Sequence, residues 1–390
     1  MSFAAVRPGS DLALQARELT RVHDAFLGGS RGQPPRSVVA RSWRRVLAAG
    51  VDPGGGTLRD PAPVEDVERR RRGSPLAAVV DELRGVLTSV ADASSFLMVV
   101  CDADGVILWR EGSARVRQQA DRLGFAEGAT WTEDAVGTNA IGTALVEAAP
   151  VQLFSAEHFA TRQHPWYCTA HPVHDPRTGA LLGVVDISGP ALTLHPAFCA
   201  LVSSAVRLAE AGLWRHHQES LDRLRRVAEP VLGAASGPAL VVDDHGWVAA
   251  RSGIAARERI AVPQADRALA VPGLGLCLPE RLAGGWLVRA ASSSEVIRAS
   301  LSPDGVLEVS GAQSWRVTLS PRHAQVLRVL ATAGRPGLTA AALSTAVFGD
   351  ADHVVTARAE VSRLRRVVGA LVSTQPYRLS DGVELVLSPA

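Results

Sequence analysis

The chain has 390 residues, 47 % of them hydrophobic and 21 % charged, which is the composition of a globular protein of two or three domains and excludes wholesale disorder. The formal net charge is only +2, so any nucleic-acid binding must rest on a local basic patch. Every basic residue is an arginine, and the absence of lysine excludes a Walker A phosphate loop and Schiff-base chemistry.

Residues 1–93 are predicted to form a helical leader. Leu12–Phe26 and Arg36–Ala49 carry apolar residues at helical spacing, and so does Glu65–Ala93, with a break near residue 74. The second of these helices combines four arginines with Trp43. A cationic helix of this kind can contact DNA, but we expect Trp43 to pack on a neighbouring element and the arginines to face solvent. The apolar stripe of Glu65–Ala93 is expected to cover a sheet.

Residues 94–213 are predicted to contain a five-stranded antiparallel sheet backed by helices. The first two strands flank the turn at Asp102–Gly105, which has the residues of a hairpin turn. Three more strands are expected, at Val151–Phe154, Tyr167–Val173 and Leu181–Ile187.

The stretch Gly124–Leu145 has three glycines where a regular element would avoid them, at Gly128, Gly137 and Gly142. Glycine permits positive φ or a close approach, so we expect a loop wall folded against a cavity, with Thr138 or Asn139 capping the next helix. Small-molecule sites are apolar with a few convergent polar groups. Hydrogen bonding within the loop and core packing remain the alternatives for these residues. The candidate ligand contacts are Trp131, Glu133, Thr138, Asn139, His158 and Phe159.

Four segments in this order resemble the GAF domain of acetoin-dehydrogenase-operon-type transcriptional activators: Cys101–Trp109, Glu127–Leu145, Ala156–Phe159 and Cys168–Gly189. The leader segment Arg36–Pro53 is also similar. The resemblance implies a sensory domain over 94–213 that binds an unidentified small-molecule effector and needs no cofactor. Those activators usually join this region to an ATPase. ATP-driven activation cannot carry over to this chain, because the sequence has no lysine for such an ATPase.

Residues 195–231 are predicted to form one long coupling helix whose apolar stripe serves as a dimer seam, with intramolecular packing as the alternative. Residues 232–292 predict a small α+β region that resembles a PAS domain and whose role the sequence does not reveal.

Residues 293–390 predict three short strands, three helices and a closing hairpin. The helices begin near Pro321, Leu338 and Val354, and the hairpin is expected over Pro376–Leu387 with its turn at Asp381-Gly382. This order, together with the segments LSPRHAQVLRVLATAGR, LTAAALSTAVFG, VSRLRR and PYRLSDG, resembles the winged helix-turn-helix of OmpR/PhoB-type response regulators. The resemblance implies binding to double-stranded DNA.

The third of these helices is amphipathic, with one side apolar and the other rich in arginine. An α-helix fits the major groove, where arginine can bind guanine through two hydrogen bonds while other residues reach phosphates. A solvated helix that uses arginine for its helix propensity is the alternative. The candidate DNA contacts are Thr356, Arg358, Ser362, Arg363 and Arg366 on the helix, and Thr374 and Arg378 at the wing.

A second hypothesis rests on five histidines and cysteines between His158 and His174, a density that suggests a metal or haem site. On one strand, however, Cys168 and His174 would point to one face and His171 to the other, which prevents a single chelate. This alternative is a metal, haem or redox sensor whose C-terminal domain binds protein rather than DNA.

The remaining features place the protein in a cell compartment and a class. The scattered cysteines favour free thiols, and the sequence has neither a signal-peptide pattern nor a membrane-length apolar run. We therefore expect a cytoplasmic bacterial α+β protein that is not an enzyme and has no membrane association. Its expected partners are double-stranded DNA, a small-molecule effector, RNA polymerase and a second copy of itself.

Overall fold

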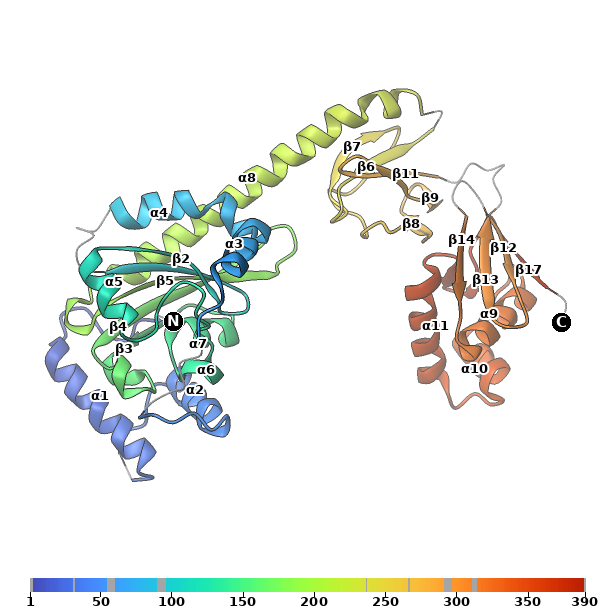
Figure 1. Cartoon of the computed structure of the whole chain (residues 1–390). Coiled ribbons are helices and arrows are strands. Elements are labelled where there is room, and N and C mark those ends of the chain that lie inside the picture. The colour runs from blue at the N-terminus through green and yellow to red at the C-terminus, as the bar shows by residue number, and fades with distance from the viewer. Residues whose placement is uncertain are drawn as a thin grey trace. The chain divides into compact units, whose positions relative to one another are not determined.

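The computed structural model of the protein describes residues 3–30, 32–54, 60–89, 96–235, 237–265, 267–290, 297–310 and 314–388. The chain divides into two compact units, Met1–His217 and Gln218–Ala390. Helices and largely antiparallel sheets alternate in both (Figure 1), which confirms the expected α+β class. The expected domain starts at residues 94 and 293 lie outside the described residues.

The first unit is built on a five-stranded sheet in which every pair of neighbours is antiparallel, as predicted. The strand order is β2-β1-β5-β4-β3. Asp102–Gly105 forms the turn between the first two strands. The strands are β1 (Leu97–Asp102), β2 (Ile107–Gly112), β3 (Val151–Phe154), β4 (Trp166–His174) and β5 (Leu181–Pro190).

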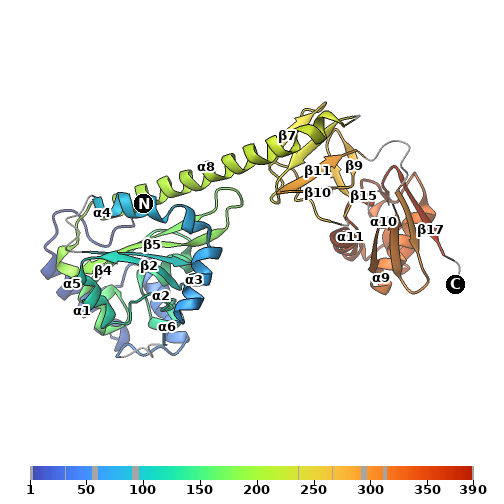
Figure 2. The same ribbon diagram turned by 45° about the horizontal axis from the view of Figure 1, so that its top comes forward.

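Helices cover both faces of this sheet (Figures 1 and 2). On one face, Leu83 of α4 and Val202 of α8 share a core with Val185 of β5. On the other face, helices α2, α6 and α7 share a core with Val99 of β1. The helices of this unit are α1 (Leu12–Leu27), α2 (Ser37–Ala48), α3 (Val64–Gly73), α4 (Val80–Ser89), α5 (Ala114–Asp121), α6 (Glu133–Val136), α7 (Ala140–Glu147) and the first part of α8 (Phe198–Gly233). Single 3₁₀ turns occur at η1 (Pro75–Ala78), η2 (Ser155–Glu157), η3 (Thr161–Gln163) and η4 (Ala191–Thr193).

The leader helices belong to this unit rather than standing apart from it. Trp43 of α2 is buried in the core, and its indole N–H donates to the carbonyl oxygen of Glu157 at 3.0 Å. The prediction that Trp43 packs on a neighbour is confirmed, but Arg36 and Arg45, which were expected to face solvent, pair with the buried carboxylates of Glu157 and Glu133. Ser74 caps η1 where the helical pattern was expected to break, and Leu76 then begins the apolar stripe that packs on the sheet.

The three glycines of Gly124–Leu145 each meet a local requirement. Gly128 and Gly137 have φ of +83° and +81°, a region that residues with a Cβ rarely occupy. Gly142 lies on α7, where a Cβ would come within 2.7 Å of the backbone nitrogen of Glu133. Positive φ at two positions and a close approach at the third were both expected from the sequence.

The second unit begins with the last part of α8, whose apolar side packs on a small sheet of its own unit. Leu221, Leu224 and Ala228 share a core with strands β6, β7 and β11. These three residues of the predicted stripe are thus covered within their own unit. The sheet has the order β10-β11-β6-β7, with a separate β8–β9 pair. The strands are β6 (Ala239–Val242), β7 (Val248–Ser252), β8 (Leu269–Val271), β9 (Gly275–Cys277), β10 (Glu280–Leu282) and β11 (Gly285–Arg289).

The rest of the second unit packs three helices against a sheet of order β14-β13-β12-β17 and a short hairpin. Each helix has a clear start: Ser320 and Thr339 cap the first two with their hydroxyls, and the third follows His353. The elements are β12 (Ile297–Leu301), β13 (Val306–Ser310), β14 (Trp315–Thr318), α9 (Pro321–Ala333), α10 (Ala340–Phe348), α11 (Val354–Val368), β15 (Val372–Thr374), β16 (Tyr377–Leu379) and β17 (Val383–Leu387).

The prediction of a hairpin over Pro376–Leu387 is wrong. Asp381-Gly382 does form a turn, but the strands on its two sides join different sheets. The hairpin is β15–β16, and β17 instead pairs in parallel with β12. That pairing packs Val383 and Leu385 against the helical core, a gain in apolar burial that a β16–β17 ribbon would not provide.

Candidate functional site

Helix α11 has one buried side and one exposed side. Four residues of its apolar side are at most 2 % exposed, so the orientation of the helix is fixed by packing. The helix ends at Gly369, whose φ of +62° suits glycine. The buried residues are Ala357, Val361, Leu364 and Val368.

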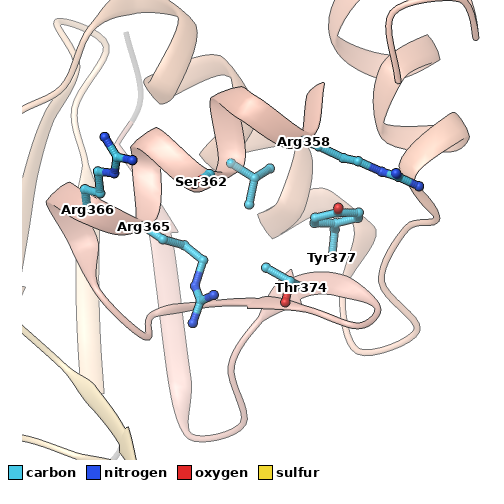
Figure 3. Close-up of a pocket in the computed structure, with 7 residues that line it drawn as sticks. Arg358, Ser362, Arg365, Arg366, Thr374 and Tyr377 are labelled. Carbon is cyan, nitrogen blue, oxygen red and sulfur yellow. The ribbon is translucent and has the colours of Figure 1, made fainter. Parts of the chain in front are cut away.

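The exposed side of α11 and the β15–β16 hairpin together line an open pocket of about 360 Å³ (Figure 3). In Figure 3, Arg358 and Arg365 extend from the helix on either side of Thr374 and Tyr377, and Arg366 points another way. Four of the predicted DNA contacts therefore meet here: Arg358, Ser362, Arg366 and Thr374. Thr356 is exposed on the first turn of the helix and does not line this pocket.

The arginines of this surface differ in whether an acid neutralises them. Arg363 lies 3.2 Å from Glu360, and Arg378 donates to both carboxylate oxygens of Asp381. Within the part of the chain that the structure describes, no ion pair involves Arg358, Arg365 or Arg366. Three guanidinium groups thus remain available to an anionic partner.

Arg365 and Tyr377 also belong to this surface, although neither was predicted from the sequence. Arg365 follows Arg358 by seven residues, two helical turns, so the same helical spacing that selected Ser362 and Arg366 would have found it. Tyr377 gave no such signal, because its position depends on the hairpin, which was predicted in the wrong place.

In the first unit, Glu133 is the centre of a buried hydrogen-bond network. Arg45 of α2 donates from Nε to Oε2 at 2.7 Å and from Nη2 to Oε1 at 2.8 Å. The hydroxyls of Ser42 and Thr143 also donate to Oε1, at 2.6 and 2.8 Å. Burial raises the pKa of Glu133, but the hydrogen bonds from Arg45, Ser42 and Thr143 outweigh burial and hold this pKa below its ordinary value.

Thr138 and Asn139 hold the same loop together. The Thr138 hydroxyl lies 2.7 Å from the hydroxyl of Ser42 on the leader helix. The Asn139 side chain accepts from the backbone N–H of Gly142 at 2.8 Å and donates to the carbonyl of Gly137 at 2.9 Å. Asn139 is therefore the helix cap, one of the two residues expected in that role.

The other three candidate ligand contacts are buried in the interior. Trp131 packs on Phe125 with ring centroids 4.2 Å apart, and Phe159 packs against Gly137. His158 places Nδ1 2.9 Å from the carbonyl oxygen of Ser155 and Nε2 3.2 Å from the Cys168 sulfur. Burial lowers the pKa of His158 to about 4, so this imidazole is neutral at physiological pH.

Of these six residues, Glu133 also lines an open pocket of about 400 Å³. Its walls come from α2, α6, α7 and the turn after β1. The cavity expected beside Gly124–Leu145 thus has a counterpart, bounded on one side by the leader helix.

A buried carboxyl group that the sequence did not single out lies on the central strand β5. Asp186 is fully buried and accepts a hydrogen bond from the Ser188 hydroxyl. Burial raises the pKa of Asp186 to about 7, only partly offset by the Ser188 bond. Its position in an apolar run hid it, because a single acid on a buried strand reads as a surface residue.

Two absences hold for the described ranges, which leave out the gaps given above. These ranges contain no group of three or more His, Cys, Asp or Glu side chains arranged to hold a metal ion. In the same ranges, no helix combines the length and the apolar character needed to cross a membrane.

A family described as MimR, N-terminal domain, matches residues 16–210, and so includes part of the leader as well as the five-stranded sheet. An uncharacterized 47.3 kDa protein from the thcA 5′ region of Rhodococcus erythropolis is 31 % identical over 389 residues, covering 97 % of this chain and 72 % of that protein. AcoR of Bacillus subtilis, named as the acetoin dehydrogenase operon transcriptional activator, is 34 % identical over 199 residues. That match covers 50 % of this chain and only 32 % of AcoR. The solved Escherichia coli DhaR(N)–DhaL complex is a more distant likeness, with 17 % identity and a TM-score of 0.46 over 64 % of this chain and 97 % of that one.

Proposed function

This chain belongs to the family of the MimR N-terminal domain, and from that premise we propose that it is a ligand-responsive transcriptional regulator. In this proposal the first unit is a GAF-type sensor of a small molecule, and residues 293–390 form a winged helix-turn-helix that binds double-stranded DNA at specific sequences. The protein is not an enzyme. It works in the cytoplasm as a homodimer and acts on RNA polymerase at its target promoter. The role of AcoR as a transcriptional activator supports a function in transcription.

The observation that carries the DNA-binding part is the cationic surface of α11. Its position is set by packing, and Arg358, Arg365 and Arg366 project from it with no acid among the described residues to neutralise them. A protruding α-helix of this kind fits the major groove, and guanidinium groups bind both phosphates and guanine edges. Thr374 on the adjacent hairpin is placed to reach the DNA backbone.

The mechanism proposed for this chain differs from ATP-driven activation. The sequence has no lysine, so no Walker A loop can bind a nucleotide phosphate within it. Regulation would instead come from the effector, which binds one conformation of the first unit more tightly and so shifts the population that is competent for DNA.

A selection from random duplexes with the full-length protein tests this proposal. We expect enrichment of one sequence class and, by fluorescence anisotropy, binding to the selected duplex on the order of 10³-fold tighter than to a scrambled one. Binding should also weaken steeply with salt, because each phosphate contact releases counterions. Equal affinity for selected and scrambled duplexes would rule out sequence-specific recognition.

A further inference from the structure

The pocket between the leader helix and α7 has the size and lining of a small-molecule site. Its volume of about 400 Å³ lies near the lower end of the range of roughly 300–1,000 Å³ found for ligand pockets. Its walls are largely aliphatic, with Val46 of α2 and Ala49 directly after that helix, and Leu145 and Val146 of α7. Val146 is 55 % exposed, an arrangement that leaves an apolar wall open to solvent.

One polar group in this lining has hydrogen-bonding capacity to spare. Arg45 uses Nε and Nη2 on Glu133 and Nη1 on Glu147. A guanidinium group has five N–H donors, so three bonds leave two N–H groups for another acceptor. Glu133 already accepts from Arg45, Ser42 and Thr143, so Arg45 is the charged group of the lining that keeps unused donors for a ligand oxygen.

The charge around the pocket argues against an ionic ligand. Glu133 and Asp134 line it, and Glu147 contacts both Arg45 and Arg41. Three carboxylates and two guanidinium groups give a local charge of −1, and the Arg45 charge is already compensated by Glu133. A carboxylate or phosphate would therefore be repelled. Asp134, which no ion pair among the described residues involves, is exposed to solvent, and an ion pair between it and an amine would contribute little.

We propose that this pocket is the effector site, and that it takes a small uncharged molecule with an aliphatic body and one hydroxyl or carbonyl oxygen bound to Arg45. This inference rests on the proposed sensing function and gives it a location. Because Arg45 and Ala49 belong to the leader while Leu145 and Val146 belong to α7, an occupant would bridge the two elements and stabilise their contact. The leader helix is then part of the sensor and not merely an extension of it.

Four-carbon probes and pocket-filling variants test the proposal in the full-length protein. The probes are butan-2-one, butan-2-ol and butanoate, followed by saturation-transfer NMR. Ala49→Phe and Val146→Phe would fill the pocket from opposite walls at exposed positions, and Leu47→Phe is the control, because Leu47 lies on the same helix outside the lining. Near-ultraviolet circular dichroism checks that each variant is folded.

We expect saturable binding of the two uncharged probes to the wild type and to Leu47→Phe, with Kd on the order of millimolar for ligands so small. Either pocket-filling variant should weaken that binding by roughly tenfold or more, and butanoate should bind least. Undiminished binding in both filled variants, preference for butanoate, or no saturable binding of the uncharged probes to the wild type would each overturn the inference. Specific DNA binding that persists in any of these cases would leave the proposed function standing without this pocket.

Discussion

Arg45 of α2 and Glu133 of α6 form a two-point ion pair, with Nε 2.7 Å from Oε2 and Nη2 2.8 Å from Oε1. The residues are separated by 88 positions in the sequence, so the pair fastens the leader to the loop that precedes α7. Glu133 is only 6 % exposed, and its charge has to be compensated where it lies. The leader therefore supplies the cation that the buried Glu133 carboxylate needs, in addition to covering apolar surface.

Loss of the Arg45 side chain should destabilise the first unit. Arg45→Ala leaves the buried Glu133 carboxylate without its cation, and we expect a loss of roughly 2–3 kcal/mol, below the usual cost for a fully buried pair because Arg45 is 35 % exposed. Urea unfolding followed by tryptophan fluorescence measures it. The matched control is Arg44→Ala, an exposed residue of the same helix, for which the change should stay within about 0.5 kcal/mol. Equal effects of the two substitutions would contradict this account.

A methyl group at Gly142 should push α7 away from α6. Its Cβ would lie 2.7 Å from the Glu133 nitrogen and 2.9 Å from the Thr132 carbonyl carbon, both backbone atoms that cannot rotate aside. We expect Gly142→Ala to cost roughly 1–3 kcal/mol, as over-packing does. Gly85→Ala is the control on α4, because a Cβ there meets nothing within 4 Å and alanine favours helices. A stabilised Gly142→Ala protein would show that the contact relaxes without strain.

Asp186 should make stability depend on pH in a direction opposite to the usual one for a carboxyl group. Its folded pKa of about 7 lies above the ordinary 3.8, so its favourable contribution is complete below pH 4 and is lost as pH rises through 7. Between pH 5 and pH 8 the wild type should lose about 3 kcal/mol through this group. Asp186→Asn removes the effect, so its stability relative to the wild type should rise by that amount.

The comparison of variant with wild type is needed because the buried His158 acts the other way. Burial lowers its pKa to about 4 from 6.5, so its contribution is gained as pH rises over this interval, and it cancels in the difference. The control substitution is Asp60→Asn, which removes a carboxyl group at an exposed position. Chemical denaturation of the wild type and both variants at pH 5 and pH 8 gives their free energies of unfolding. If the difference between Asp186→Asn and the wild type is the same at both pH values, the raised pKa of Asp186 is refuted.

Local pattern predicted most of the elements because their signals lie within a few residues. Helical spacing located α1, α2 and α9, and the residues of the Asp102–Gly105 turn located the first hairpin. The strand pairing of β17 could not be read in this way. Val383 pairs with Ile297, a residue about half of the second unit's length earlier in the sequence, and nothing near Asp381-Gly382 reveals that partner. A turn signal marks where the chain reverses, but not which sheet the next strand joins.

The candidate site residues also differ in whether local sequence pattern could identify them. Arg358, Ser362 and Arg366 were found because a helix places them on one face, and that face is exposed. The ion pair of Arg45 with Glu133 could not be predicted from the sequence, because only the docking of the leader brings the two residues together. Polar residues such as Asn139 looked like ligand contacts, yet their hydrogen bonds are made within the loop. Distinguishing the two roles needs the positions of neighbouring backbone groups.

The surface of α11 should give a salt dependence that individual arginines can be shown to set. If Arg358, Arg365 and Arg366 contact phosphates, replacing all three with alanine should reduce the slope of log affinity against log salt by about 2.7. Replacing Arg363 alone should change the slope less than any one of the three, because Glu360 already pairs with it. Anisotropy titrations over a series of salt concentrations measure the slope. An unchanged slope in the triple variant would place the phosphate contacts elsewhere.

The most direct test of the whole account is the affinity of full-length protein for its selected duplex, compared between two triple variants of equal charge. One carries Arg358→Ala, Arg365→Ala and Arg366→Ala. The other carries Arg226→Ala, Arg257→Ala and Arg298→Ala, three exposed arginines away from the α11 pocket. The account predicts loss of sequence-specific binding in the first, by roughly a hundredfold or more, and near-wild-type affinity in the second. Equal losses in both, or retained specific binding in the first, would contradict it.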